Sequence, residues 1–420
     1  MDPPELCKPG EVQIATNVDI TDTHQARRRD GYSSVYAGTP FSVWANKKGT
    51  ICLFREGNNL NSLSTAWAAS NIRTDLTVSA WMNYLELNDR IYYSDGIFTG
   101  IYDGTTDRSW GLTLPDPPTP SATTGDLQAG RYLIVLTYHR NDGQESGSSV
   151  VTSVDIPSNG GGISLTGIPV SPDSTVDYVY IYITTCDGET FYLAKTITNG
   201  MTSTTYIGNT TEFRLPIRTL FLSPPLAGHN LQFYNGRIYI AQGDTIYYSE
   251  PYSYELFDLA HNRIHLDSRI AVMAPVLDGI WVATQNRTVF LQGEDAPQFK
   301  YIQRTDYGAI ENTQSELPEF KEGGEELKAW IWASSDGIIS GLQGGIIKNL
   351  TGSKYANESM TMGCSLRREE NDRTLFIVNL YPLESASASP SLSPSKSPSK
   401  SPSKSPSKSP SASPSASPSS

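Results

Sequence analysis

The sequence is poor in charged residues and has no long apolar run. Charged residues make up 18% of the 420 residues, so the long Lys, Glu and Arg side chains typical of helices are scarce. No run approaches the roughly 20 apolar residues that a membrane-spanning helix needs, so we expect no membrane span. The N-terminus lacks the basic and apolar regions of a signal peptide, which predicts synthesis in a reducing cytoplasm without export.

Cysteine is also scarce. The chain has four cysteines, without a C-x-x-C pair: Cys7, Cys52, Cys186 and Cys364. This pattern favours small inert thiols over a disulfide framework or a metal site. His261 and His265 are four residues apart, a spacing that converges on a metal only in a helix. The surrounding sequence predicts loop and strand, so we predict no metal site.

The charge balance excludes a basic surface as the overall design. The net charge is −12, and the last 37 residues contribute four Lys and one Glu, so the rest carries −12 − (+3) = −15. A chain of this charge repels nucleic acid on average, although a local basic patch stays open. Glycine-rich stretches at 160–162 and 323–324 lack the Lys-Ser or Lys-Thr of a phosphate loop, and no cofactor is predicted.

What the sequence has in abundance is Tyr, Gly, Thr and short turns, with 23 Tyr and 34 Gly. Residues 231–293 show the pattern most clearly. β-rich runs alternate there with Asn-Gly, Gly-Asp, Asp-Gly and Gln-Asn turns, and the runs are Arg237–Ala241, Thr245–Ser249, Ile280–Thr284 and Thr288–Leu291. Such runs predict antiparallel hairpins, because Asn and Gly accept the positive φ of tight turns.

Two short echoes suggest that one unit is reused. Residues 88–92 (NDRIY) resemble residues 235–239 (NGRIY), and residues 91–95 (IYYSD) resemble residues 246–250 (IYYSE). Between the echoes, a Pro-rich stretch at 115–120 reads as a stiff connector. Six or seven short strand signals follow within about a hundred residues, a spacing typical of an Ig-like or fibronectin type III-like sandwich.

Without that insert, hairpin signals recur near residues 47, 89, 236, 279, 336 and 372. The spacing of about 40–50 residues is that of β-propeller blades. We therefore predict an all-β chain with a propeller of about six blades, with five or seven as alternatives. The N-terminal strand is expected to complete the last blade and close the ring. The predicted parts are 1–112 (propeller), 113–222 (insert), 223–383 (propeller) and 384–420 (tail).

The tail is a Ser-Pro repeat with interspersed Lys and almost no apolar residues. Such a composition cannot bury enough surface to offset chain entropy, so residues 384–420 are expected to be disordered.

Candidate catalytic residues are scattered. Carboxylate pairs at 255/258, 294/295 and 325/326 would suit a glycoside hydrolase only if the fold brought two of them together. The Ser-Asp-Gly turns at 94–96 and 335–337 resemble the Asp-box turns of sialidase propellers but lack the Gly-x-Thr-Trp that should follow. We predict no enzyme.

Three segments resemble tailed-phage and prophage virion proteins: NVDI with ARRRDGY at 17–32, IYYSEP with YELFD at 246–258, and DGIWVAT with VFLQG at 278–293. The hairpin at 130–149 is similar to the fibronectin-like insert of the same proteins. The resemblance implies a structural virion component, a tail hub, nozzle or head-completion protein, assembled as a homo-oligomeric ring around the DNA exit channel. DNA would make only passing contact with that channel.

On this interpretation the chain functions through protein-binding surfaces, and its partners are other virion proteins. The residues predicted to form interfaces are Arg27, Arg28, Arg29, Glu250, Tyr252, Tyr254 and Phe257. For the three arginines, pairing with acids is favoured over contact with nucleic acid. The alternative is a propeller that binds or cleaves carbohydrate during receptor recognition, with a glycan as the ligand.

Overall fold

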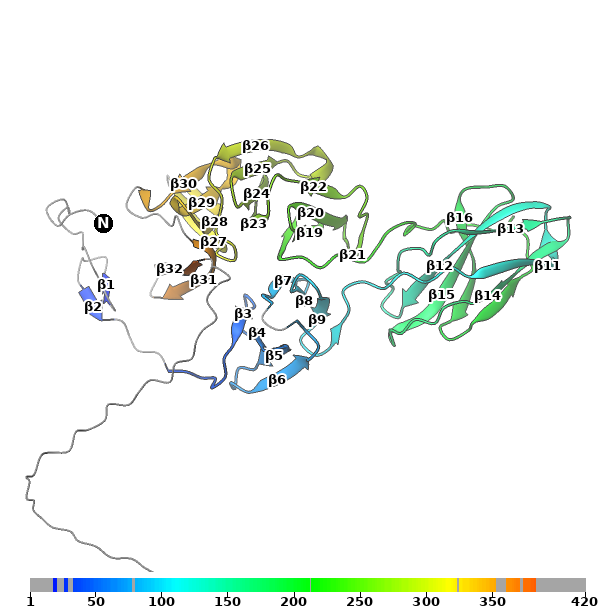
Figure 1. The fold of residues 1–420 in the computed structure, drawn as a ribbon, viewed down its shortest axis with the longest axis horizontal. Coiled ribbons are helices and arrows are strands. Elements are labelled where there is room, and N and C mark those ends of the chain that lie inside the picture. The colour runs from blue at the N-terminus through cyan, green and yellow to red at the C-terminus, as the bar shows by residue number, and fades with distance from the viewer. Residues whose placement is uncertain are drawn as a thin grey trace, which may run out of the picture. The chain divides into compact units, whose positions relative to one another are not determined.

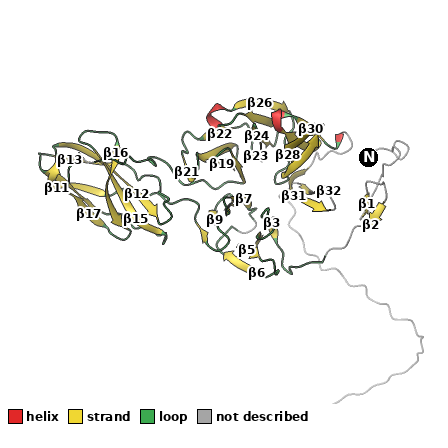
Figure 2. Cartoon of the chain, turned by 180° about the vertical axis from the view of Figure 1, so that it is seen from behind, coloured by secondary structure: helices red, strands yellow, loops and turns green. Residues whose placement is uncertain are grey.

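The computed structural model describes residues 18–20, 26–28, 33–77, 80–211, 213–322, 325–352, 360–370 and 373–382. Antiparallel strands dominate this part of the chain, and short 3-10 helices lie at Ala296–Gln298 (η2) and Gln343–Gly345 (η3). Strands are yellow and helical turns red in Figure 2. The all-β prediction is confirmed. Among the described residues, no helix has the length and apolarity to cross a membrane.

Five sheets are meanders of four strands in which each strand pairs with the next along the chain, and one of them has an additional fifth strand. The first contains β3 (Phe41–Ala45), β4 (Cys52–Glu56), β5 (Asn59–Leu63) and β6 (Ala69–Arg73). The second contains β7 (Asn83–Leu87), β8 (Arg90–Ser94), β9 (Thr99–Tyr102) and β10 (Asp107–Arg108). The third contains β18 (Asn230–Tyr234), β19 (Arg237–Gln242), β20 (Thr245–Glu250) and β21 (Ser253–Phe257), with β22 (Arg263–His265) also paired to β20.

The fourth sheet contains β23 (Ile270–Val276), β24 (Gly279–Thr284), β25 (Thr288–Gln292) and β26 (Lys300–Thr305). The fifth contains β27 (Ser315–Glu322), β28 (Glu325–Ser334), β29 (Gly337–Leu342) and β30 (Ile347–Asn349). Two further sheets have two strands each: β31 (Met360–Glu370) with β32 (Arg373–Pro382), and β1 (Val18–Ile20) with β2 (Ala26–Arg28).

Apolar side chains pack between consecutive sheets, which lie side by side in Figure 1. In β24, Ile280 and Val282 pack against the third sheet, whereas Trp281 and Ala283 pack against the fifth. In β19, Ile238 faces the second sheet and Tyr239 the fourth, and the other sheet boundaries are filled in the same way. Strands buried on both faces read as continuous apolar runs without polar alternation. This packing of meander on meander is a β-propeller, and the prediction is confirmed.

The tight turns follow from the residues that the sequence places there. Asn88 and Asp89 join β7 to β8, and Asn235 and Gly236 join β18 to β19, all with positive φ. The first echo (88–92 and 235–239) therefore marks equivalent positions in two blades. The second echo (91–95 and 246–250) does not, because β8 is the second strand of its sheet and β20 the third.

The insert is a sandwich of a three-stranded and a four-stranded sheet. The first pairs β11 (Thr119–Leu127), β14 (Gly161–Thr166) and β17 (Ser203–Tyr206), and the second pairs β13 (Thr152–Ile156), β12 (Gly130–Arg140), β15 (Val176–Thr184) and β16 (Phe191–Thr198). The sequence analysis missed β11, because Pro120 made the stretch read as a connector. Since β11 is an edge strand, its proline removes no donor that the sheet requires.

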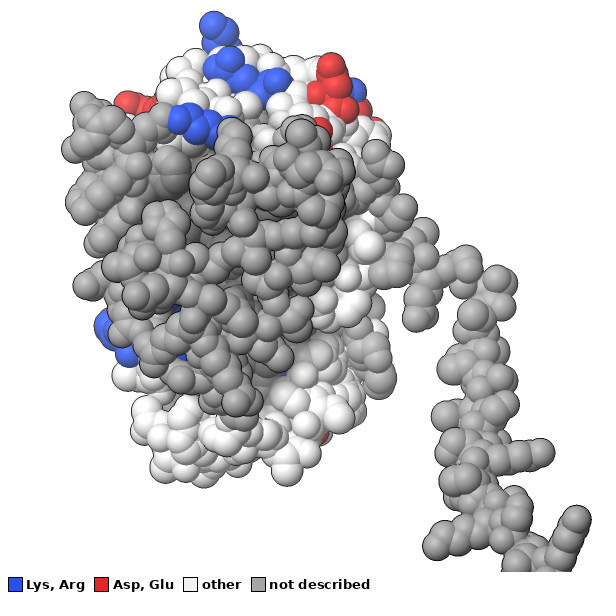
Figure 3. Space-filling model, turned by 90° about the vertical axis from the view of Figure 1, so that its left-hand side faces the viewer, with Lys and Arg blue, Asp and Glu red and all other residues white. Residues whose placement is uncertain are grey.

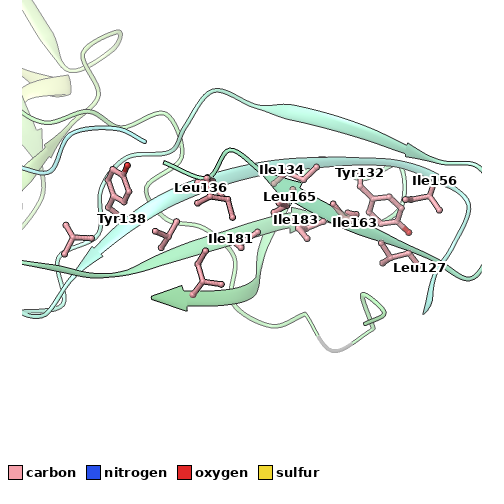
Figure 4. Close-up of a cluster of buried hydrophobic side chains, with 14 of the residues drawn as sticks. Leu127, Tyr132, Ile134, Leu136, Tyr138, Ile156, Ile163, Leu165, Ile181 and Ile183 are labelled. Carbon is pink, nitrogen blue, oxygen red and sulfur yellow. The ribbon is translucent and has the colours of Figure 1, made fainter. Parts of the chain in front are cut away.

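The insert has a core of its own. In β15, Val179, Ile181 and Ile183 point between the two sheets and are fully buried, whereas Tyr178 and Tyr180 lie on the other face. Ile134, Leu136, Ile163 and Leu165 meet them from neighbouring strands (Figure 4). Strands β1 to β32, the insert included, belong to one compact unit, Met1–Pro382. The tail predicted to be disordered, residues 384–420, lies outside the described residues.

Candidate functional site

The residues predicted to form interfaces lie at two places. Arg27 and Arg28 belong to β2, and Arg29 lies outside the described residues. Glu250, Tyr252, Tyr254 and Phe257 belong to the turn and strands of β20 and β21. The second group is the one whose surroundings can be built up contact by contact.

The β20–β21 turn has one exposed side and one buried side. Tyr252 is largely exposed, has positive φ, and donates its backbone N–H to the Gly236 carbonyl at 2.8 Å. Glu250 accepts a hydrogen bond from the Asn262 amide at 2.7 Å. Phe257, by contrast, is completely buried. Phe257 therefore makes a contact inside the chain, which corrects its prediction as an exposed interface residue.

Strand β21 holds both connections to the insert. On the incoming connection, the indole N–H of Trp110 donates to the Tyr254 carbonyl at 2.9 Å, and Trp110 packs edge-on against Phe257. On the outgoing connection, Phe257 and Ser223 exchange two backbone hydrogen bonds of 2.9 Å. The predicted interface segment is thus the internal attachment point of the sandwich.

A buried group of charges lies at the same attachment point. Arg140, at the end of β12 in the insert, donates to both carboxylate oxygens of Glu255 in β21 at 2.8 and 3.0 Å. Arg108, in β10, approaches the same carboxylate at 3.2 Å, and the Gly111 N–H adds a bond of 3.3 Å. Arg140 also forms a two-pronged pair with Asp142 at 2.9 and 3.0 Å. We call Arg108, Arg140, Asp142 and Glu255 the junction cluster.

Within the junction cluster, hydrogen-bond partners stabilise the charged forms of Arg140 and Asp142. Burial disfavours the charged form of Arg140 and would lower its pKa. Hydrogen bonds to Asp142 and Glu255 outweigh this effect, so the pKa of Arg140 is raised. Burial likewise opposes ionisation of Asp142, yet Arg140 and the Gln144 N–H bring its pKa below the ordinary value. Removing one partner from such a buried pair leaves an uncompensated charge, which destabilises by about 3–5 kcal/mol.

A second polar group lies where the inner strands of three blades meet. The amides of Asn230 and Gln314 exchange two hydrogen bonds of 2.9 and 3.0 Å between the third and fifth blades. Arg269 forms a two-pronged pair with Glu311 at 2.7 and 3.1 Å. The His229 ring lies 2.7 Å from the Ile270 carbonyl, and burial followed by the nearby Arg269 lowers its pKa.

A third contact joins the first blade to the fifth. The ammonium of Lys47, in the β3–β4 turn, lies 3.0 Å from Glu316 in β27, and Lys328 approaches the same carboxylate at 3.3 Å. Burial would raise the pKa of Glu316, but the two lysines lower it. On the face drawn in Figure 3, described Lys and Arg side chains lie near described Asp and Glu side chains at the top of the view.

The candidate catalytic turns are occupied by structural contacts. Asp95 accepts the N–H groups of Ile97 and Phe98 at 3.0 and 2.7 Å and lies 3.5 Å from the buried Arg55. Asp336 bonds through its side chain to Asn349 at 3.0 Å. Asp95 and Asp336 thus shape turns, as Asx residues commonly do.

The paired carboxylates and histidines are similarly engaged. Asp258 accepts two backbone N–H groups and contacts His261 at 2.8 Å, whereas His265 faces Thr245 instead. Asp295 pairs with Arg237 at 3.0 Å. Within the described residues, no group of three or more His, Cys, Asp or Glu is placed to hold a metal ion.

Sequence reasoning missed Arg108, Arg140 and Glu255 as a set. Arg140 and Glu255 are 115 residues apart, and Arg108 and Glu255 are 147 apart. The one local signal was Asp142 two residues after Arg140 in the Asn-Asp-Gly hairpin tip. Long-range charge pairing across an inserted domain leaves no periodic pattern in the sequence.

Comparison with known proteins gives likenesses of fold class and no family. No family model matches the chain, and no curated protein matches it. Among solved structures, the N-terminal part of BBS1 in complex with ARL6 has 12% identity and a TM-score of 0.33, covering 82% of this chain and 89% of that one. The N-terminal domain of Nup159 has 8% identity and a TM-score of 0.27, covering 80% and 72%. Dipeptidyl peptidase 4 of Porphyromonas gingivalis has 10% identity and a TM-score of 0.28, covering 79% and 41%. Likenesses this low carry no argument about function.

Proposed function

We propose that the chain is a non-enzymatic structural component of a tailed-phage particle, a tail hub, nozzle or head-completion protein. It would act through protein surfaces, assembled as a homo-oligomeric ring with other virion proteins as partners. The proposal starts from the sequence resemblance at 17–32, 246–258 and 278–293.

The observation that carries the proposal is the attachment of the insert. Two connecting segments bind the same strand, and the junction cluster fixes the angle between sandwich and blade by buried, directional bonds. A flexible glycan-capturing arm would need no such cluster. A particle component needs a rigid arm, because neighbouring subunits must meet it at a defined position.

The charge supports a channel wall more than a DNA-binding surface. The chain without its last 37 residues carries −12 − (+3) = −15, and described charges of both signs lie at the top of the face in Figure 3. A wall of this net charge repels DNA phosphates, so DNA would slide past it.

The first experiment measures the mass of the purified chain by light scattering and images the same sample in negative stain. We expect symmetric rings, alone or after mixing with phage neck proteins. The Tyr252→Asp variant, altered at the exposed tip of the β20–β21 turn, is expected to weaken ring formation. Leu277→Asp, at an equally exposed turn in the next blade, is the matched control.

A monomer that ignores neck proteins at all concentrations would contradict the proposal. A glycan screen of the same sample addresses the alternative of carbohydrate recognition. Saturable binding of one glycan by a monomer would replace the structural role with a receptor-binding role.

A further inference from the structure

The last propeller sheet is half of a blade. Within the described residues, β31 pairs with β32 and β32 pairs with no other strand, whereas each of the five preceding propeller sheets has at least four strands. The β1–β2 hairpin at the other end of the propeller sequence has the complementary number of strands. An unpaired edge is a site where another strand adds.

One face of β31–β32 is bound and the other is open. Ser365 lies on the bound face and contacts Ser315 at 2.9 Å. The Gly363 N–H donates to the Glu311 carbonyl at 3.0 Å, which occupies the edge of β31 and leaves the edge of β32 free among the described residues. The register places Met362 opposite Tyr381 and Leu366 opposite Ile377 on the other face, which we call the open face. These four side chains are 37%, 44%, 58% and 46% exposed.

The open face differs from the faces of the preceding sheets. Large apolar side chains at the boundaries between the first five sheets are almost fully buried, as Trp281 and Trp332 are. The open face therefore exposes two large apolar pairs, with the Cys364–Asn379 pair between them, in positions that a further sheet would cover. The Lys47–Glu316 contact joins the first and fifth blades much as the Asn230–Gln314 contact joins the third and fifth, between which the fourth blade lies.

We propose that the β1–β2 hairpin of the same chain adds to the free edge of β32 and completes a sixth, four-stranded blade. The hairpin is joined directly to the first sheet, so its docking draws that sheet over the open face. The closed ring then has no uncovered apolar face at this boundary. This inference does not depend on the virion role.

The connection favours the chain's own hairpin over that of a second copy. From Arg28 to Phe41 the chain has 13 steps, a reach of up to about 45 Å when extended. A connection of this length gives an effective local concentration on the order of millimolar, well above that of a second copy in a dilute sample.

The test is hydrogen exchange of the β32 amides (373–382) in the full chain, followed by mass spectrometry. We expect slow exchange, and at least tenfold faster exchange in the Asp19→Pro variant, because proline in the middle of β1 removes a ladder donor. Ala386→Pro, in the Ser-Pro tail, is the matched control and should leave the exchange of β32 unchanged. A peptide of residues 11–32 added to the chain lacking residues 1–32 should restore the slow exchange.

Fast exchange of β32 in the full chain, or equal exchange in the full chain and Asp19→Pro, would overturn the inference. Protection that appears only as the chain dimerises, measured by light scattering across a concentration series, would also overturn it, since the occupant would then be a second copy. Leu366→Lys keeps the hairpin intact and provides an independent check. It should speed β32 exchange, whereas Leu277→Lys, at an exposed turn of the fourth blade, should not.

Discussion

The inserted sandwich and the propeller bury their apolar side chains in different ways. The sandwich buries its apolar side chains between its own two sheets, so its core lies within residues 112–213. Each propeller sheet instead shares its apolar side chains with the sheets before and after it. Apolar burial in the propeller is therefore complete only if its last sheet is also covered by a neighbouring sheet. The core of the sandwich needs no such neighbour.

The two regions also differ in where they place buried charge. The core of the sandwich is apolar, and its buried arginine, Arg140, lies at its end and points to Glu255 of the propeller. In the propeller, Arg55 and Asp95 form a buried pair between the first two blades. Buried charges here mark boundaries between parts, where directional bonds fix orientation.

The largest effect should come from breaking a shared propeller boundary. Trp281 is fully buried, packs against Phe290 and Trp332, and donates its indole N–H to the Leu342 carbonyl at 2.9 Å. Trp281→Ala should lower the free energy of unfolding of the propeller by about 4 kcal/mol, through lost contacts and a cavity.

Differential scanning calorimetry measures this effect. We expect the propeller transition to move to lower temperature while that of the sandwich stays in place. Trp67→Ala, at an exposed tryptophan, is the control. If both transitions moved together, the two regions would share one cooperative core, and the contrast drawn above would be wrong.

The next effect tests the attachment between the regions. Glu255→Gln keeps the shape of the side chain but leaves Arg140 and Arg108 without their shared carboxylate. We expect a loss of about 3 kcal/mol, as for other broken buried pairs. Small-angle scattering should show a wider distribution of distances between sandwich and propeller.

Glu250→Gln is the matched control for that variant, because Glu250 lies in the neighbouring strand and its carboxylate accepts a hydrogen bond from the Asn262 amide rather than from an arginine. It should leave the scattering curve unchanged. Equal scattering from Glu255→Gln and the unaltered chain would show that the two connecting segments alone hold the insert.

A smaller effect depends on pH and concerns the propeller only. The pKa of His229 in the folded chain lies below its ordinary value of 6.5, because burial and then Arg269 disfavour the imidazolium, against the Ile270 carbonyl and Glu311. The contribution of His229 to stability is therefore present above pH 6.5 and is lost as the pH falls through the lowered pKa.

Urea denaturation at a series of pH values between 7.5 and about 5 measures this dependence. The propeller midpoint should fall with pH, and His229→Gln should flatten that dependence while leaving the sandwich unaffected. An unchanged slope in His229→Gln would assign the dependence to another group.

The smallest effect is expected at the contact of the first and fifth blades. Lys47 is 81% exposed, so its pair with Glu316 is screened by solvent. Lys47→Ala should change the free energy of unfolding by no more than about 0.5 kcal/mol, and the difference should vanish in high salt. A larger, salt-insensitive loss would show that the alkyl chain of Lys47 also stabilises the contact between the first and fifth blades by packing.

Several strands and turns could be predicted from local sequence. The runs at 237–241, 245–249, 280–284 and 288–291 correspond to β19, β20, β24 and β25 within one residue at each end. Asn88-Asp89 and Asn235-Gly236 form the predicted turns, because their positive φ is a local property of those residues. Strand β11 was missed because Pro120 is unfavourable in a central strand, and nothing local marks an edge.

The sequence by itself determined the β-class, the turns and the insert, since each depends on residues close together along the chain. Only the tertiary structure decided that Phe257 is buried, that Arg108 and Arg140 meet on Glu255, and that Met362, Leu366, Ile377 and Tyr381 share one open face. The physical reason is that burial and ion pairing depend on which distant strands become neighbours. Strand periodicity is a property of each segment alone and carries no such information.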